Sequence, residues 1–299
     1  MDVMLTHILV GLAAFGVPGV FLTRWLRPDD RGVVFWSTAL IAGPMVVGLL
    51  VTTVAVVGNV AVPRWGLFTV SLVITLIAAL FGRPSAGTSR ARIARAAWTP
   101  LLLGVGVLLL YWLQYDRTLF QFNCVNRASA LILGGDPTGA PLHHDYLLAA
   151  NRNVRLGNVS LVSPFFIGFG FVGPRLLYGV IGASLYLWGW RLGNTVFKRS
   201  AIGHLLGVLL ALNPYVLGIP ILDENLFACL ATTIVLTAIA EDRIQGVWLG
   251  LVLGLLIGFR HLAVLLLPAV FWALKRRHLN RQTWQALLIP LSLVLGLWA

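Results

Sequence analysis

The stretch VVFWSTALIAGPMVVGLLVTTVAVV, residues 33–57, contains no charged residue. A helix over this range is long enough to cross the hydrocarbon core of a bilayer, which takes about 20 mostly apolar residues. The segment therefore predicts a membrane-spanning helix, and the segments on either side of it can be read against that prediction.

The composition of the whole chain agrees with this prediction. The chain has 299 residues, of which 59% are hydrophobic and 11% are charged, whereas soluble domains carry roughly 25% charged residues. A soluble fold of this size could not cover its surface with polar groups. The same figures exclude a disordered chain, a coiled coil, a collagen and a disulfide scaffold. We therefore predict an all-α, polytopic membrane protein.

Further apolar segments bring the prediction to about ten transmembrane helices. The predicted spans 246–259 and 261–274 are short. A helix of 14 residues covers about 21 Å, whereas the hydrocarbon core is about 30 Å thick. The predicted spans are 5–23, 33–57, 65–82, 97–114, 175–190, 201–219, 225–240, 246–259, 261–274 and 284–299.

The basic residues predict the orientation of these spans, because cytoplasmic loops hold an excess of Lys and Arg. If the spans simply alternate, the basic loops all fall on one side, which places both termini outside, in what we expect to be the plasma (inner) membrane. The residues are Arg24, Arg27, Arg31, Arg83, Arg90, Arg92, Arg95, Arg191, Lys198, Arg199, Arg243, Lys275, Arg276, Arg277 and Arg281.

The formal charge of +12 is thus a topology signal whose partners are membrane lipids with anionic headgroups. Nucleic acid is not expected, because no basic cluster lies on a soluble module. Asp29, Asp30, Glu241 and Asp242 share the cytoplasmic side with the arginines, and we expect them to be solvated loop charges.

Chemistry, if present, is predicted at the outer face, where the long loop 115–160 follows a span. Asp116, directly after the span that ends at Gln114, is a candidate general base. The alternative is an ion pair with Arg117 that ends the helix. His143, His144 and Asp145 could hold a divalent cation, the one cofactor predicted here, or could form a polar turn.

Three further polar groups lie on the same side. Arg152 and Arg155 suit phosphate or carboxylate, or pair with loop acids. Asp223 and Glu224 begin a span, where the helix dipole favours acids. Arg260 and His261 join the two short spans, where a cation is costly unless it meets an anion or water; they could bind a lipid phosphate or extend to headgroups.

Residues 97–274 resemble the GT-C superfamily of membrane glycosyltransferases, including its protein mannosyltransferase-like and aminoarabinose transferase-like branches. The likeness lies in the order of a span, a long outer loop and short motifs. The matching motifs are Ser163-Pro164-Phe165-Phe166, Gly173-Pro174-Arg175-Leu176-Leu177, Leu212-Asn213-Pro214-Tyr215, Asp223-Glu224 and Phe259-Arg260-His261.

The resemblance implies N-terminal transmembrane helices over 1–96 and a GT-C-like transmembrane core over 97–299, with the outer loop 115–160. It implies transfer of a sugar from a polyprenyl-phosphate donor to a glycan, lipid or protein acceptor at the outer face. The family's base is an acid in the first large outer loop, which Asp116 matches best. Phe122-Asn123-Cys124-Val125-Asn126 stands where the family usually has paired acids.

Other classes of function stay open. A transporter or flippase for a lipid-linked envelope precursor would need ionisable residues along a path at mid-membrane, and the sequence offers few. A non-catalytic membrane assembly subunit would have its outer acids pointing apart. An acyltransferase would use His143 or His144.

Overall fold

In the computed structural model, the described residues are all helical or in connecting loops, with no strand among them. These residues are 12–58, 60, 62–82, 98–114, 161, 164–165, 167–169, 173–213, 224–241, 244–259, 261–277 and 279–298. The all-α prediction is confirmed within them. The elements are η1 (Leu12–Gly16), α2 (Val17–Leu26), α3 (Gly32–Gly58), α4 (Arg64–Phe81), α5 (Trp98–Gln114), α9 (Gly173–Phe197), α10 (Ser200–Ala211), α12 (Glu224–Ala240), α13 (Gly246–Phe259), η5 (His261–Leu266), α14 (Leu267–Lys275) and α15 (Arg281–Trp298).

One helix within the described ranges, Gly32–Ala55 inside α3, is both long and apolar enough to cross a membrane. Helix α3 contains the whole stretch 33–57 that the sequence singled out. Shorter apolar helices lie at six other predicted spans: Trp65–Phe81, Trp98–Leu113, Ser200–Ala211, Leu226–Ala240, Gly246–Gly258 and Ala263–Lys275. The number of spans and their orientation stay predictions.

The second of the two short predicted spans is a composite helix. Residues 261–266 form the 3-10 helix η5, which continues into α14. A 3-10 helix rises about 2.0 Å per residue, more than the 1.5 Å of an α-helix. The composite 261–275 therefore reaches about 25 Å, further than an α-helix of the same number of residues.

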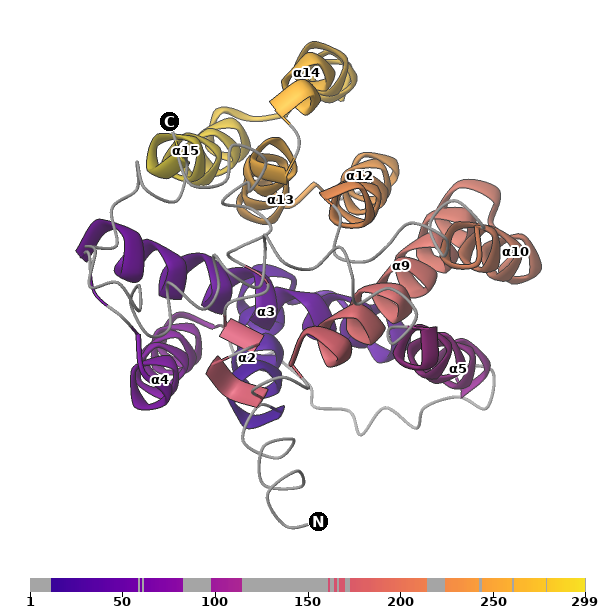
Figure 1. Cartoon of the computed structure of the whole chain (residues 1–299). Coiled ribbons are helices and arrows are strands. Elements are labelled where there is room, and N and C mark those ends of the chain that lie inside the picture. Colours follow the sequence, from indigo (N-terminus) through magenta and orange to yellow (C-terminus); the bar gives the residue numbers. More distant parts are fainter. Residues whose placement is uncertain are drawn as a thin grey trace.

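Helix α9 lies at the centre of the described structure and contacts α3, α5, α10 and α12. Figure 1 shows α9 running obliquely across the molecule, with α5 and α10 beside it and α12 leading on to α13, α14 and α15. Helices α2 and α4 pack near α3 on the other side. Helix α9 therefore connects the two groups of helices.

Glycines allow α9 and α10 to approach closely. A Cβ atom on Gly193 would lie 2.8 Å from the Cα atom of Gly203, and one on Gly189 would lie 2.9 Å from the Cα atom of Gly207. Each helix thus presents two glycines four residues apart, the spacing that brings helix backbones together in membranes. The order of the contacts shows that α9 and α10 run antiparallel.

Other contacts fix the direction of the remaining helices relative to α9. Trp112, near the end of α5, contacts Arg175, near the start of α9, so these helices are antiparallel. Arg191 and Glu241, near the ends of α9 and α12, form an ion pair, so those helices are parallel. We call the end of the bundle that contains Arg191 and Glu241 the charged end, and the other the opposite end.

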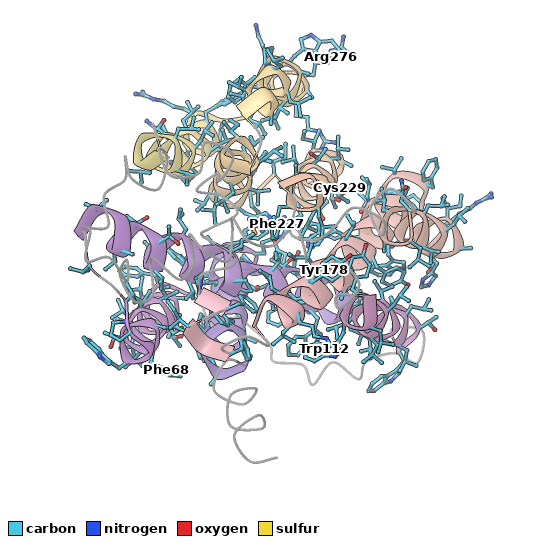
Figure 2. The ribbon with its side chains drawn as sticks, in the orientation of Figure 1. Phe68, Trp112, Tyr178, Phe227, Cys229 and Arg276 are labelled. Carbon is cyan, nitrogen blue, oxygen red and sulfur yellow. The ribbon has the colours of Figure 1, made fainter. Side chains whose placement is uncertain are left out.

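The outward faces of several helices carry large apolar side chains. On α4 and α5, Leu80, Phe81, Leu102 and Leu113 are among the most exposed residues. Figure 2 shows side chains projecting away from the bundle around its edge. Soluble monomers rarely expose apolar surface of this extent, and a lipid environment would cover it.

Candidate functional site

Most of the site residues predicted from sequence lie outside the described residues: Asp116, His143, His144, Asp145, Arg152, Arg155, Asp223 and Arg260. Glu224 begins α12 and His261 begins η5, but their side chains are not among those described. The catalytic, binding and metal assignments at the outer face therefore stay predictions. Within the described ranges no group of three or more His, Cys, Asp and Glu side chains could hold a metal ion.

The helix ends that flank these residues share one end of the bundle. Helix α5 ends at Gln114, two residues before Asp116, and α12 begins at Glu224. Because α5 is antiparallel to α9 and α12 is parallel to it, both of these ends lie at the opposite end. Helix α13 ends at Phe259, directly before Arg260. It starts just after Glu241 at the charged end, so its last residue also lies at the opposite end.

The described polar site is a buried cluster of charges at the charged end, and it begins in the turn between α2 and α3. Pro28 is the second residue of this turn, which Asp30 closes by donating its N–H to the carbonyl oxygen of Arg27 at 3.0 Å. Proline is favoured at the second position of such a turn. Gly32 follows with φ of +56°, a conformation that glycine adopts without strain.

The turn brings Arg27 against Asp30 in a two-point contact. Nε of Arg27 donates to Oδ2 of Asp30 at 2.9 Å, and Nη2 donates to Oδ1 at 3.2 Å. Paired guanidinium–carboxylate contacts of this kind are among the strong hydrogen bonds in proteins.

Arg191, at the charged end of α9, makes a second two-point contact with the same carboxylate. Its Nη1 and Nη2 donate to Oδ2 and Oδ1 of Asp30 at 3.0 and 3.1 Å. Thr38 of α3 donates its hydroxyl to Oδ2 at 2.9 Å. Both oxygens of Asp30 are therefore fully occupied by donors from α3, α9 and the turn.

Glu241, just after α12, bridges the two arginines. Arg191 donates to its Oε1, and Arg27 donates to its Oε2. Arg277, which follows α14, donates to the backbone carbonyl oxygen of Glu241. The cluster thus joins segments far apart in the sequence, from the turn before α3 to the residues after α14.

These charges are removed from solvent and balance one another. The side chains of Arg27 and Arg191 are each 4% exposed, that of Asp30 is 6% exposed and that of Glu241 is 14% exposed. Burial alone would lower the pKa of Arg27, but the carboxylates of Asp30 and Glu241 outweigh burial and raise that pKa above its ordinary value. The formal charges of the two arginines and the two carboxylates cancel, and their ion pairs link α9 and the residue after α12 to the turn before α3.

A tryptophan pair supports the cluster from within the bundle. The guanidinium carbon of Arg191 lies 4.5 Å from the ring centroid of Trp188, and Trp188 donates Nε1–H to the carbonyl oxygen of Ser37 at 3.0 Å. The rings of Trp188 and Trp248 stack with centroids 6.4 Å apart. Arg191 is therefore held on one side by carboxylates and on another by an aromatic face.

The expectation that Asp30 and Glu241 are solvated loop charges is wrong, because both side chains are buried in ion pairs. The physical reason is that four segments bring their ends to one place, where each acid meets two arginines. A signal was present in the sequence. Acids are uncommon on the side that carries the basic loops, and here they occur where arginines flank a turn or a helix end.

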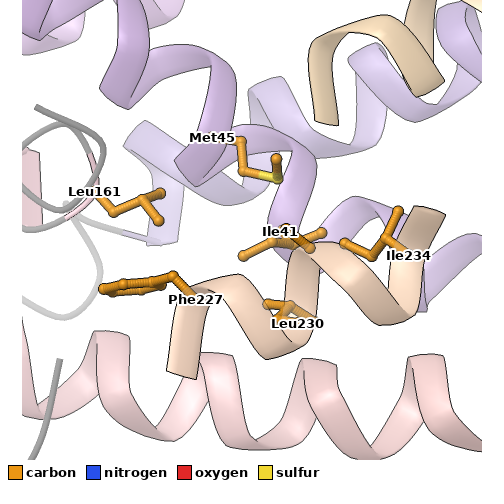
Figure 3. Close-up of a pocket in the computed structure, with 7 residues that line it drawn as sticks. Ile41, Met45, Leu161, Phe227, Leu230 and Ile234 are labelled. Atoms are coloured by element: carbon orange, nitrogen blue, oxygen red, sulfur yellow. The ribbon is translucent and has the colours of Figure 1, made fainter. Parts of the chain in front are cut away.

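The described pocket is an apolar crevice between α3 and α12, shown in Figure 3. Its cavity volume is about 10 Å³, which is room for about one water molecule. Its lining residues are Ile41, Met45, Leu161, Phe227, Leu230, Ala231 and Ile234. It offers no group for acid–base chemistry or for holding a metal ion.

Comparison with known proteins adds no assignment. The chain matches no family model, no curated protein and no solved structure.

Proposed function

We propose that the chain is a polytopic membrane glycosyltransferase, with about ten transmembrane helices, that moves a sugar from a polyprenyl-phosphate donor to an acceptor at the extracytoplasmic face. The proposal places the charged end in the cytoplasm and the opposite end outside, in the plasma (inner) membrane. The resemblance of residues 97–274 to the GT-C superfamily is its starting point.

The observation that carries the proposal is the arrangement of three helix ends. The end of α5, the start of α12 and the end of α13 lie at one end of the bundle, and they adjoin Asp116, Asp223 and Arg260 in the sequence. The proposal puts these acids and this cation, which come from distant parts of the chain, on the same side. Glycosyl transfer to an acceptor hydroxyl requires a base for that hydroxyl. It also requires groups that stabilise the leaving phosphate, at the same face of the membrane.

The proposed roles follow from that chemistry. The carboxylate of Asp116 takes the proton of the acceptor hydroxyl. At the same time the oxygen of that hydroxyl bonds to the anomeric carbon of the sugar. The bond from that carbon to the phosphate oxygen breaks, and polyprenyl phosphate leaves with both bonding electrons. Arg260 would stabilise the phosphate, helped by Arg152, Arg155 or His261, while Asp223 and Glu224 would bind sugar hydroxyls. A divalent cation held by His143, His144 and Asp145 would add positive charge to stabilise the leaving phosphate.

One further observation favours this function over transport. Among the described residues, the buried charges of the cluster are paired near the ends of helices, where the carboxylate oxygens are occupied, whereas a transporter would need ionisable residues along a path at mid-membrane.

The test is to incubate the purified protein, in lipid nanodiscs, with a panel of polyprenyl-phosphate sugars and to measure which one is consumed. We expect one donor to be consumed, with loss of turnover in Asp116→Asn. Asp29→Asn, an exposed acid at the charged end, is the matched control and should keep its turnover. Full turnover in Asp116→Asn would remove that residue as the base, and no consumption of any donor would contradict the function.

A further inference from the structure

The last turn of α5 is capped by a side chain from α9. Nε of Arg175 donates to the backbone carbonyl oxygen of Trp112 at 2.9 Å, and the guanidinium carbon lies 4.7 Å from the centroid of the Trp112 ring. Figure 2 shows Trp112 in the region where α5 and α9 meet. The last carbonyl groups of a helix lack partners within it, and a cation there is favoured by the helix dipole.

Neighbouring contacts fix the same turn from α10 and from further residues of α9. The hydroxyl of Tyr111 donates to the carbonyl oxygen of Ala211, at the end of α10, at 2.6 Å. Its ring lies 4.6 Å from that of Tyr178 on α9, centroid to centroid. A Cβ atom at Gly182 would lie 2.6 Å from the Tyr111 ring, so glycine leaves room for this contact. Arg175 adds the hold nearest to the end of α5.

The residue type at position 175 is informative. Arg175 lies at the opposite end, whereas most of the described residues of the basic loops lie at the charged end. A lysine ammonium could donate to the carbonyl oxygen, but the planar guanidinium can donate and stack on the tryptophan ring together. The contact therefore uses properties specific to arginine, and it acts on the last described turn of α5, after which the chain continues to Asp116.

We propose that Arg175 is a positioning residue, which holds the last turn of α5 in place through the carbonyl group and ring of Trp112. The proposal rests on the proposed transferase function, in which Asp116 is the base. A displacement of about 1 Å at a reacting group can lower a rate by roughly 100-fold. Arg175 acts through the α5 turn and does not itself react.

The test compares Arg175→Ala and Arg175→Lys with a matched control. Arg276→Ala removes another guanidinium stacked on a tryptophan, 3.8 Å from the centroid of the Trp272 ring, at the distant α14 (Figure 2). Two measurements are made on the full chain in nanodiscs. The first is hydrogen–deuterium exchange of the amides in the last turn of α5, and the second is kcat and KM for the donor consumed by the wild type.

We expect Arg175→Ala to speed exchange in that turn roughly tenfold, the order that one hydrogen bond to a charged group contributes. We also expect it to lower kcat roughly 10- to 100-fold while KM for the donor changes little. Arg175→Lys should recover part of both effects, and Arg276→Ala should change neither.

Each other outcome is decisive. Unchanged exchange in Arg175→Ala would overturn the cap. Faster exchange with an unchanged kcat would overturn the positioning role. Faster exchange in a protein whose wild type consumes no donor would leave the cap in place and reject the proposed function instead.

Discussion

Arg191 and Glu241 lie 50 residues apart in the sequence, and their side chains meet in a buried ion pair where α9 and α12 end. The pair shares its arginine with Asp30 and its carboxylate with Arg27. Helices α9 and α12 are parallel and are tied together near their last residues, so both helices begin at the opposite end of the bundle.

Replacing Glu241 with Gln should destabilise the protein strongly. The variant leaves Arg27 and Arg191 buried with one carboxylate between them, and removing one partner of a buried pair costs about 3–5 kcal/mol. Thermal unfolding in detergent, followed by the loss of monodisperse protein, measures the change. Lys275→Gln, an exposed residue at the end of α14, should stay within about 0.5 kcal/mol of wild type. Equal unfolding temperatures for both variants would refute the structural role of the cluster.

Arg27→Lys should also destabilise the protein, although it keeps the charge. Arg27 uses Nε and Nη2 to reach Asp30 and Glu241, and one lysine nitrogen cannot reproduce that two-point geometry. We expect a loss of about 1.5–3 kcal/mol, the contribution of a hydrogen bond to a charged group. The exposed Arg24→Lys is the control, and similar stabilities for the two variants would contradict the geometry.

The raised pKa of Arg27 fixes the sign of its pH dependence. A folded-state pKa above the unfolded value contributes stability at pH below the unfolded value and loses it as pH rises through the folded value. Both values lie in strongly alkaline solution, so Arg27 itself should remain charged between about pH 5 and pH 9. A fall in the stability difference between wild type and Arg27→Gln, which has no titrating group at this position, between pH 7 and pH 9 would contradict this.

Gly193→Ala should weaken the contact between α9 and α10. The added methyl group would lie 2.8 Å from the Cα atom of Gly203 and 3.1 Å from the carbonyl oxygen of Ile202, and backbone atoms cannot move aside as a side-chain end can. The expected cost is about 1–3 kcal/mol, as for overpacking in a core. Gly106→Ala in α5 is the matched control, because nothing lies within 4 Å of its added methyl group. That control should be neutral or stabilising, and equal effects at both sites would contradict the close approach.

Apolar runs predicted the helices well. The segment 246–259 coincides with α13, and 33–57 lies within α3, which extends one residue further at each end. Uncharged segments bounded by charges or by Gly and Pro leave the backbone no alternative to helix inside an apolar environment. Register within a helix pair depends on small residues such as Gly193 and Gly203, and no single-chain pattern reveals which pairs meet.

The charged end could not be predicted in the same way. Asp30 and Glu241 are separated by most of the chain, and their burial depends on how α2, α9 and α12 pack. The composition of a loop does not distinguish a solvated charge from a charge in a buried ion pair. The composite η5–α14 was likewise predicted as one short span, because local sequence does not distinguish a 3-10 turn from an α-helical one here.

The most direct test of the whole account is to measure turnover per folded molecule and unfolding temperature together for Asp116→Asn and Glu241→Gln. We expect the first variant to lose turnover and to keep the wild-type unfolding temperature. We expect the second to unfold at a lower temperature while its folded fraction still consumes the donor. A Glu241→Gln protein that is stable but inactive, beside an Asp116→Asn protein with full turnover, would contradict the separation of chemistry and stability between the two ends of the bundle.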